Sequence, residues 1–240
     1  MQQYPGGVNP QIAEQVEKDK KKEKAKTNKG CLNGLGDLKG DPDRQRFVVK
    51  VYTIVFCQLL LTTFVTAGVY NSEDAKQWFR DNYWVTYVCM FIGFGVSCAL
   101  ICCQKNARKV PRNYILLFIF TVCWTIMVAG ITQWYDAEDV LTAAGLTTAM
   151  TLGLTVFACF CRIPLTILYG AVIAGTFALI PLILFAIIFR DKLLFQILCY
   201  FVIILTSIYI IFDTRLILDK KGLPLDDYVI AALMLYTDII

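Results

Sequence analysis

The sequence predicts an all-α, polytopic membrane protein, and two observations support that prediction. The 240 residues are 57% hydrophobic and 18% charged, whereas soluble domains are about half apolar and about a quarter charged. The apolar residues are gathered in runs long enough to cross a hydrocarbon core of roughly 30 Å, which takes about 20 helical residues. Because a membrane interior forces the backbone to satisfy its own hydrogen bonds, each run is expected to be a helix.

Six of these runs are expected to be complete transmembrane helices. They cover residues 47–70, 83–103, 114–134, 140–160, 165–189 and 193–218. A seventh begins near Tyr228 and reaches Ile240 after about 13 residues, roughly 20 Å of helix, which is too short to span the membrane. Either the chain continues beyond Ile240 or this helix is re-entrant, and we favour the first explanation.

Residues 1–46 differ in character from the predicted transmembrane bundle, which covers residues 47–240. The stretch "EKDKKKEKAK", residues 17–26, is a dense charge run that cannot bury enough apolar surface to fold alone. We expect a disordered, basic tail. The alternative is a polybasic strip drawn to anionic lipid headgroups.

The basic residues between the helices predict the orientation in the membrane. The connections on the side of the tail carry most of the positive charge: Lys105, Arg108, Lys109, Arg112, Arg162, Lys220 and Lys221. Cytoplasmic loops are enriched in lysine and arginine. The N-terminus is therefore expected to be cytoplasmic.

The composition also limits the chemistry that the chain can perform. It has no histidine, which excludes Ser-His-Asp and Cys-His mechanisms and removes the usual imidazole metal ligand. Most of its ten cysteines lie in apolar runs, where cysteine behaves as a small core residue. We expect no enzyme activity, and a lipid bilayer rather than nucleic acid as the main partner.

Two aspartates stand in apolar stretches, Asp213 in "IIFDTRLIL" (residues 210–218) and Asp238 in "AALMLYTDII" (residues 231–240). A carboxylate in the hydrocarbon region costs a few kcal/mol and usually faces a bundle interior or a wet cavity. The connection between the two helices is short, so they should be antiparallel neighbours. The helical rise then places Asp213 about 7 Å and Asp238 about 14 Å from their shared end, which lets the side chains meet if both face inward.

Two carboxylates that close share a proton and titrate as a coupled pair. Calcium prefers oxygen ligands and would compete with that proton. The sequence therefore predicts a pH sensor or gate, and a calcium site, formed by Asp213 and Asp238. The alternative is that each aspartate caps backbone groups or lies near the headgroups, and the shallower Asp213 is more open to that interpretation.

Two further features are possible modulators of this pair. Arg215 lies two residues from Asp213, so it points elsewhere on the helix and is expected to extend to the cytoplasmic interface. The alternative is that Arg215 pairs with a carboxylate and locks the gate. Thr147, Thr151 and Thr155 recur at steps of four on one helix face. They either bond within and between helices or line a water pathway.

Five blocks carry a resemblance to a known family: "RQRFVVKVYTIVFCQLLLT" (residues 44–62), "CCQKNARKVPRNYILL" (102–117), "GLTTAMTLGLTVFACF" (145–160), "FDTRLIL" (212–218) and "DDYVIAALMLYTDII" (226–240). Their order and spacing resemble the transmembrane Bax-inhibitor-motif family, most closely its Lifeguard and glutamate-receptor-associated branch.

The resemblance implies a seven-helix fold whose last helix is central. It also implies a calcium leak in endoplasmic reticulum or Golgi membranes, modulated by pH through a di-aspartyl sensor that maps onto Asp213 and Asp238. Suppression of cell death, with partner proteins in that process, is implied as well. Two departures are Arg215, where the family usually has a neutral residue, and the lack of an arginine between residues 83 and 103, where bacterial relatives have one. A non-conducting scaffold that regulates partner proteins and a cation/proton exchanger are the alternative functions.

Overall fold

A computed structural model describes residues 41–103, 107–160, 163–189, 192–219 and 222–240. These ranges contain helices, turns and bends but no strand. The helices are α3 (Pro42–Asn71), α4 (Glu73–Asp81), α5 (Trp84–Cys102), α7 (Arg112–Thr132), α8 (Ala137–Phe160), α9 (Leu165–Phe189), α10 (Lys192–Leu218) and α11 (Tyr228–Ile239).

Six of these helices, α3, α5, α7, α8, α9 and α10, are long and apolar enough to cross a membrane. This confirms the predicted polytopic helical bundle, and α11 is the expected shorter seventh helix. The side chains that face outward are strongly apolar. Phe64, Phe91 and Phe177, for example, are each about 70% exposed, which suits contact with lipid tails rather than with water.

The first transmembrane helix, α3, begins earlier than predicted. The carboxylate of Asp41 accepts a hydrogen bond from the backbone N–H of Arg44 at 3.2 Å, and Pro42 occupies the first turn. Both are typical helix-start features. The predicted boundary between tail and bundle at residue 46 therefore lies inside a helix. Residues 1–40, with the predicted disorder and the charge run, lie outside the described residues.

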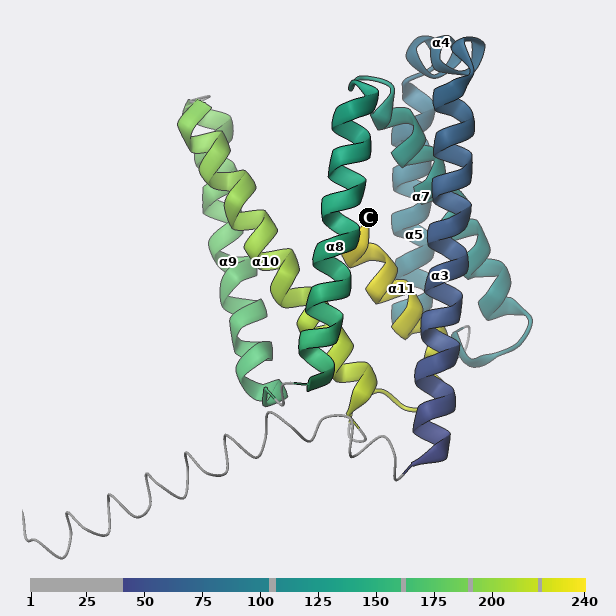
Figure 1. The fold of residues 1–240 in the computed structure, drawn as a ribbon, viewed down its shortest axis with the longest axis vertical. Helices are drawn as coiled ribbons and strands as arrows, with labels where there is room; N and C mark the ends of the chain where they lie inside the picture. The colour runs from purple at the N-terminus through teal and green to yellow at the C-terminus, as the bar shows by residue number, and fades with distance from the viewer. Residues whose placement is uncertain (1–40, 104–106, 161–162, 190–191, 220–221) are drawn as a thin grey trace, which may run out of the picture.

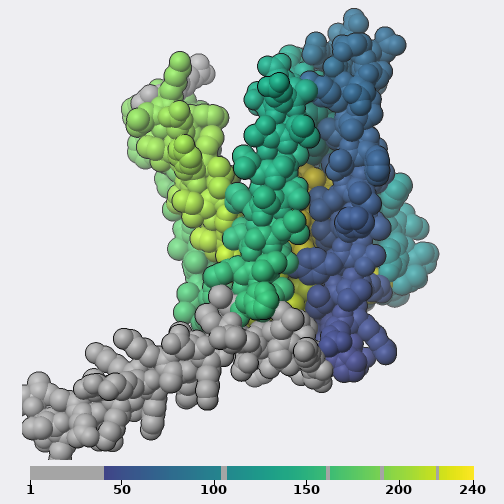
Figure 2. All heavy atoms as spheres, in the orientation of Figure 1, coloured from purple at the N-terminus to yellow at the C-terminus, as the bar shows by residue number. Residues whose placement is uncertain are grey.

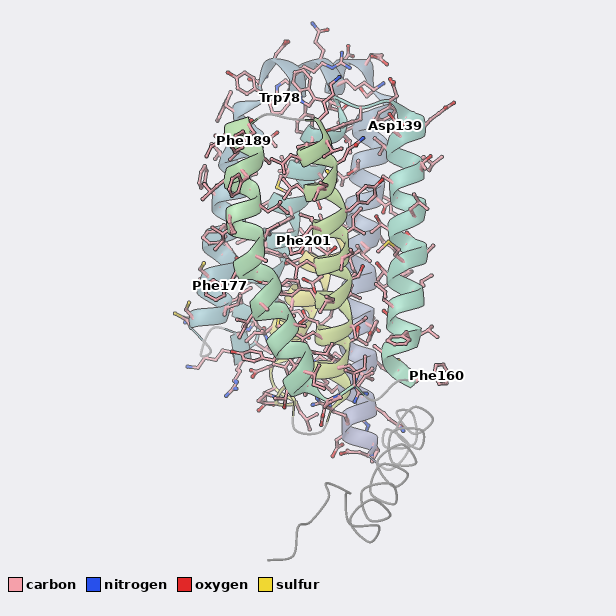
Figure 3. All side chains as sticks on the ribbon, turned by 90° about the vertical axis from the view of Figure 1, so that its left-hand side faces the viewer. Trp78, Asp139, Phe160, Phe177, Phe189 and Phe201 are labelled. Atoms are coloured by element: carbon pink, nitrogen blue, oxygen red, sulfur yellow. The ribbon has the colours of Figure 1, made fainter. Side chains whose placement is uncertain are left out.

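The short helix α4 is absent from the sequence prediction, because its nine mostly polar residues are indistinguishable from a loop by apolar periodicity. Ser72 caps it by accepting from the N–H of Ala75 at 3.4 Å. The ammonium of Lys76 lies 2.9 Å from the Glu73 carboxylate and holds the pKa of that exposed carboxyl below its ordinary value. Figure 3 shows Trp78 of α4 and Asp139 at one end of the bundle, with Phe160 at the other.

Helices α3, α5 and α7 form one packed group and α8, α9 and α10 form another, and α11 lies between them (Figure 1). Helix α7 packs against both α5 and α3, while α10 packs against both α9 and α8. Figure 2 shows a notch between α8 and the α9–α10 pair at the end far from the start of α3. We call the end where α3 begins the N-terminal end of the bundle and the other the far end.

Helix α11 lies between two packed clusters of buried side chains. One of its faces joins α5 and α7 in a cluster that includes Leu100, Phe120 and Tyr236. Its other face joins α3 and α10 in a cluster that includes Val51 and Ile217. The short helix that carries Asp238 is thus surrounded by α3, α5, α7 and α10.

Candidate functional site

Asp213 lies near the end of α10 in a buried setting. It is 3% exposed, and the following residue, Thr214, is completely buried. Helices α3, α8, α9 and α11 all pack against α10. This burial favours an interior location for the carboxylate over the alternative position near the lipid headgroups.

Asp238 is half-buried on α11, and its carboxyl group faces that of Asp213 within hydrogen-bond reach. The structure thus brings together the two carboxylates that the sequence singled out. The Oδ2 atom of Asp238 is buried and has no hydrogen-bond partner among the described residues. A proton or a cation held between the two groups would satisfy the oxygens that the protein leaves unpaired.

The turn between α10 and α11 sets the register of the two acids. The N–H of Gly222 donates to the Asp219 carbonyl at 3.0 Å, and the N–H of Leu223 donates to the Leu216 carbonyl at 3.3 Å. A Cβ atom at position 222 would clash with the Leu216 carbonyl oxygen. Glycine is therefore required at this turn because the backbone itself occupies the space that a side chain would need.

Arg44 of α3 holds this turn from the side. Its guanidinium donates to the carbonyls of Leu223 at 2.6 Å and Leu216 at 3.0 Å, and also to that of Asp219. The last carbonyls of a helix have no intrahelical partner, and a cation at that end also complements the helix dipole. Arg44, which is 3% exposed, therefore fixes the end of the helix that carries Asp213.

The start of α11 is held by contacts from three other parts of the chain. Arg108 binds both oxygens of Asp227, with Nε–Oδ1 at 2.6 Å and a guanidinium NH2–Oδ2 contact at 2.8 Å. This carboxylate raises the pKa of the Arg108 guanidinium above its ordinary value. The amide of Asn113 donates to the Tyr228 hydroxyl at 3.1 Å, and the Lys50 ammonium lies 3.2 Å from the centre of the Tyr228 ring.

These holding residues could have been found in part from the sequence. Arg44 stands at a helical interval from Phe47, Val51 and Val55, all of which are buried. The 3–4 residue periodicity therefore extends the buried face of α3 back to Arg44, whereas the neighbouring Arg46 is exposed. The pairing of Arg108 with the start of α11 carries no comparable signal, because the two loops meet only through the tertiary fold.

Arg215 lies in the last turn of α10, and its extension to the cytoplasmic interface stays a prediction. It is 8% exposed, and its charge acts on Cys159 of α8. Whether Arg215 locks the acid pair stays a prediction.

The three predicted threonines of α8 occupy different environments. Thr147 is exposed, and Thr151 is half-buried with an Oγ1 that has no partner among the described residues. Thr155 lies near the hydroxyl of Tyr52, which also approaches Thr214 beside Asp213. Thr155 is therefore the member of the row that approaches the part of α10 around Thr214. Tyr52 was not singled out from the sequence, because an aromatic residue in an apolar run is indistinguishable from core packing.

The two carboxylates alone do not form a closed metal site. The described residues contain no group of three or more His, Cys, Asp or Glu side chains placed to hold a metal. Calcium takes six to eight oxygen ligands, and two carboxylates supply at most four. Water or hydroxyl groups would have to complete the shell of a calcium ion held there.

The fold and the acid pair define a class: a polytopic helical membrane protein with two carboxylates meeting in its interior. The family model for "Inhibitor of apoptosis-promoting Bax1" matches residues 44–240. The chain belongs to this Bax inhibitor family.

Curated relatives place it near the Lifeguard proteins. It is 29% identical over 213 residues to protein lifeguard 3 of Homo sapiens, covering 86% of this chain and 68% of the relative. The mouse (Mus musculus) lifeguard 3 is 28% identical over 203 residues, covering 82% of this chain and 66% of the relative. The mouse lifeguard 4 is 32% identical over 198 residues, covering 82% of this chain and 81% of the relative. The chain thus spans about two thirds of the length of the lifeguard 3 proteins. No solved structure matches it.

Proposed function

We propose that this protein is a pH-modulated calcium leak channel of intracellular membranes, in the endoplasmic reticulum or Golgi. The observation that carries the proposal is the contact between the carboxyl groups of Asp213 and Asp238, on two helices that the α10–α11 turn joins. Buried carboxylates in a membrane bundle are costly, and they typically mark ion or proton pathways.

The pair can exist in two states that differ in charge. With one shared proton, the carboxyl groups hydrogen-bond and hold α11 against α10. Without the proton, two like charges in a medium of low dielectric constant repel each other unless a cation lies between them. A hydrated calcium ion fits that requirement, and its incomplete protein shell allows it to leave again.

Competition for the same oxygens sets the sign of the pH response. A proton on the pair excludes calcium, so the flux should fall as the pH drops through the titration of the pair. It should rise as the pH increases and the shared proton is lost. This sign follows from direct competition between proton and ion.

Basic residues in the part of the chain that the structure describes support a cytoplasmic location for the N-terminal end of the bundle. Arg108, Lys109 and Arg112 lie in the α5–α7 connection and the start of α7, and positive charge of this kind is enriched in cytoplasmic loops. Asp136, just before α8, and Glu138, in the first turn of α8, are instead acidic and exposed, and they would attract cations at the far end. Lys105, Arg162, Lys220 and Lys221 lie outside the described residues.

The test is calcium flux into proteoliposomes that contain the purified full chain. We expect the double variant Asp213→Asn plus Asp238→Asn to change the flux at least several-fold and to remove its pH dependence. Asp139→Asn, an exposed acid of the far end, is the matched control and should retain a pH-dependent flux. If the double variant conducts as the wild-type chain does at every pH, the acid pair is not the gate.

Two other functions would give different results in related experiments. A cation/proton exchanger would move protons in fixed stoichiometry with calcium, which a pH indicator inside the vesicles measures. A scaffold that regulates cell death would lose its cellular effect on deletion of residues 1–40 while the reconstituted flux stayed unchanged. The family description, which names inhibition of apoptosis, is the reason to measure cell survival alongside flux.

A further inference from the structure

A second polar feature runs through the bundle along the interface of α3 and α7, away from the two aspartates. The amide nitrogen of Gln58 donates to the Thr121 hydroxyl at 2.8 Å. One turn further along, the hydroxyls of Thr62 and Thr125 are 3.0 Å apart. Both contacts join residues 63 positions apart, so α3 and α7 run parallel and in register here.

The same register extends this interface toward the far end. On α3 the next position at a step of four is Thr66, and on α7 the next positions are Ala129 and Gln133. Successive steps of four stay on nearly one face of a helix, about 6 Å apart. From Thr121 to Gln133 the row covers about 18 Å, more than half of a hydrocarbon core of roughly 30 Å. We call this row the α3–α7 seam and define it as Gln58, Thr62, Thr66, Thr121, Thr125 and Gln133.

The seam is buried but not internally satisfied. Gln58 is 6% exposed and Gln133 is 3% exposed. The Oε1 atoms of both, and the Oγ1 atom of Thr66, are buried without a hydrogen-bond partner among the described residues. Polar groups that merely join two membrane helices would pair with each other. Three unpaired oxygens along one seam instead indicate that water supplies the missing partners.

Helix α11 contacts the seam one turn from its inner end. The hydroxyl of Tyr236, which is completely buried, lies 2.8 Å from that of Thr62. Tyr236 and Asp238 stand two residues apart on α11, so they project to opposite flanks of that helix. One flank contacts the seam and the other contacts Asp213. A movement of α11 that separates the carboxyl groups therefore also moves Tyr236 relative to Thr62.

We propose that the α3–α7 seam binds a file of water and forms the part of the cation path between the bundle centre and the far end, with Tyr236 as its inner closure. Neutral hydroxyl and amide oxygens hold water and the hydration shell of a hard cation without the cost of another buried charge. The inference that the seam is hydrated depends on the unpaired oxygens and the contacts described above. Its role in conduction rests on the proposed function.

Thr66 and Thr63 provide a matched pair of test positions. The hydroxyl of Thr66 is buried and unpaired, whereas Thr63 is exposed on the outer surface and bonds to the Leu59 carbonyl at 2.8 Å. Thr66→Val removes a group that makes no protein hydrogen bond, so a structural role would leave the protein unchanged or more stable. A role in hydrating the path predicts a calcium flux that falls several-fold in liposomes while the Tm does not fall, with Thr63→Val at the wild-type flux.

Water access is measured separately on Thr66→Cys and Thr63→Cys in the full chain. The probe is 2-sulfonatoethyl methanethiosulfonate, a charged thiol reagent, and peptide mass spectrometry reads the modification at the substituted position. We expect Thr66→Cys to react faster than Thr63→Cys, which faces lipid. Absence of reaction at Thr66→Cys, or equal reaction at both positions, would overturn the hydrated seam.

The flux and labelling experiments separate this inference from the proposed function. If Thr66→Val conducts normally while the double aspartate variant does not, the channel proposal survives and the seam is not its path. If the wild-type chain conducts no calcium, the channel proposal fails, and labelling still decides whether the seam holds water.

Discussion

Replacing Arg44 with methionine should destabilise the protein strongly. Methionine retains the packing of the aliphatic stem. It removes the guanidinium, whose carbon lies 4.7 Å from the centre of the Phe47 ring, and with it the donors to three carbonyls at the end of α10 and in the turn that follows. Each hydrogen bond to a charged donor contributes about 1.5–3 kcal/mol, and because such losses are not additive within one network we expect about 3–5 kcal/mol in all. For a chain of this size that corresponds to a fall in Tm on the order of 10 °C.

The assay is thermal unfolding of the purified protein in detergent, followed by the intrinsic fluorescence of its four tryptophans. Arg46→Met is the control, because that side chain is 83% exposed and lies 3.9 Å from Asp43; an exposed pair of this kind contributes at most about 1 kcal/mol. Arg44→Lys should give an intermediate result, since one ammonium cannot reproduce the planar fork of donors. Equal Tm values for Arg44→Met and Arg46→Met would refute the holding role of Arg44.

Three further substitutions test other parts of the structure. Gly222→Ala should lower the stability by about 1–3 kcal/mol in the same thermal assay, because the backbone must shift to admit the Cβ atom. Gly68→Ala is the control: position 68 has open space around it, so this substitution should be neutral or slightly stabilising. Tyr236→Phe should lower the stability by about 1 kcal/mol through loss of the hydrogen bond to Thr62, and it should raise the basal calcium flux. An unchanged flux would argue against Tyr236 as the closure of the seam. Arg108→Gln should loosen the start of α11, seen as faster amide hydrogen exchange in residues 228–232 than in the wild-type chain, and equal exchange would contradict that role.

The transmembrane fold was accessible from the sequence because the membrane imposes one strong rule. Apolar runs such as that of α9 had to be helical, and its predicted bounds agree with the structure. The start of α3 was misjudged because Asp41 and Pro42 act through local capping, which hydropathy does not register. The helix α4 was missed for a similar reason, since its start depends on Ser72 rather than on a run of apolar residues.

The parts of the candidate site that depend on the free-energy cost of a carboxylate in an apolar run, and on the short connection between two helices, were predictable from the sequence. The parts that depend on tertiary contacts were not. A carboxylate in an apolar run stands out from composition alone, so Asp213 and Asp238 could be paired through the short α10–α11 connection. The burial of Arg215 could not be predicted, because it depends on how the neighbouring helices pack against α10. The seam was also invisible in the sequence, since Gln58 and Thr121 become partners only after α3 and α7 pack in register.

The most direct test of the central claim is an infrared difference spectrum of the reconstituted protein before and after calcium addition at constant pH. If the pair exchanges its proton for calcium, the carbonyl band of a protonated carboxylic acid should disappear on calcium addition. That change should be absent from the variant with asparagine at positions 213 and 238. A wild-type spectrum without any change in this band, under conditions where calcium crosses the membrane, would contradict the exchange of proton for ion at these two residues.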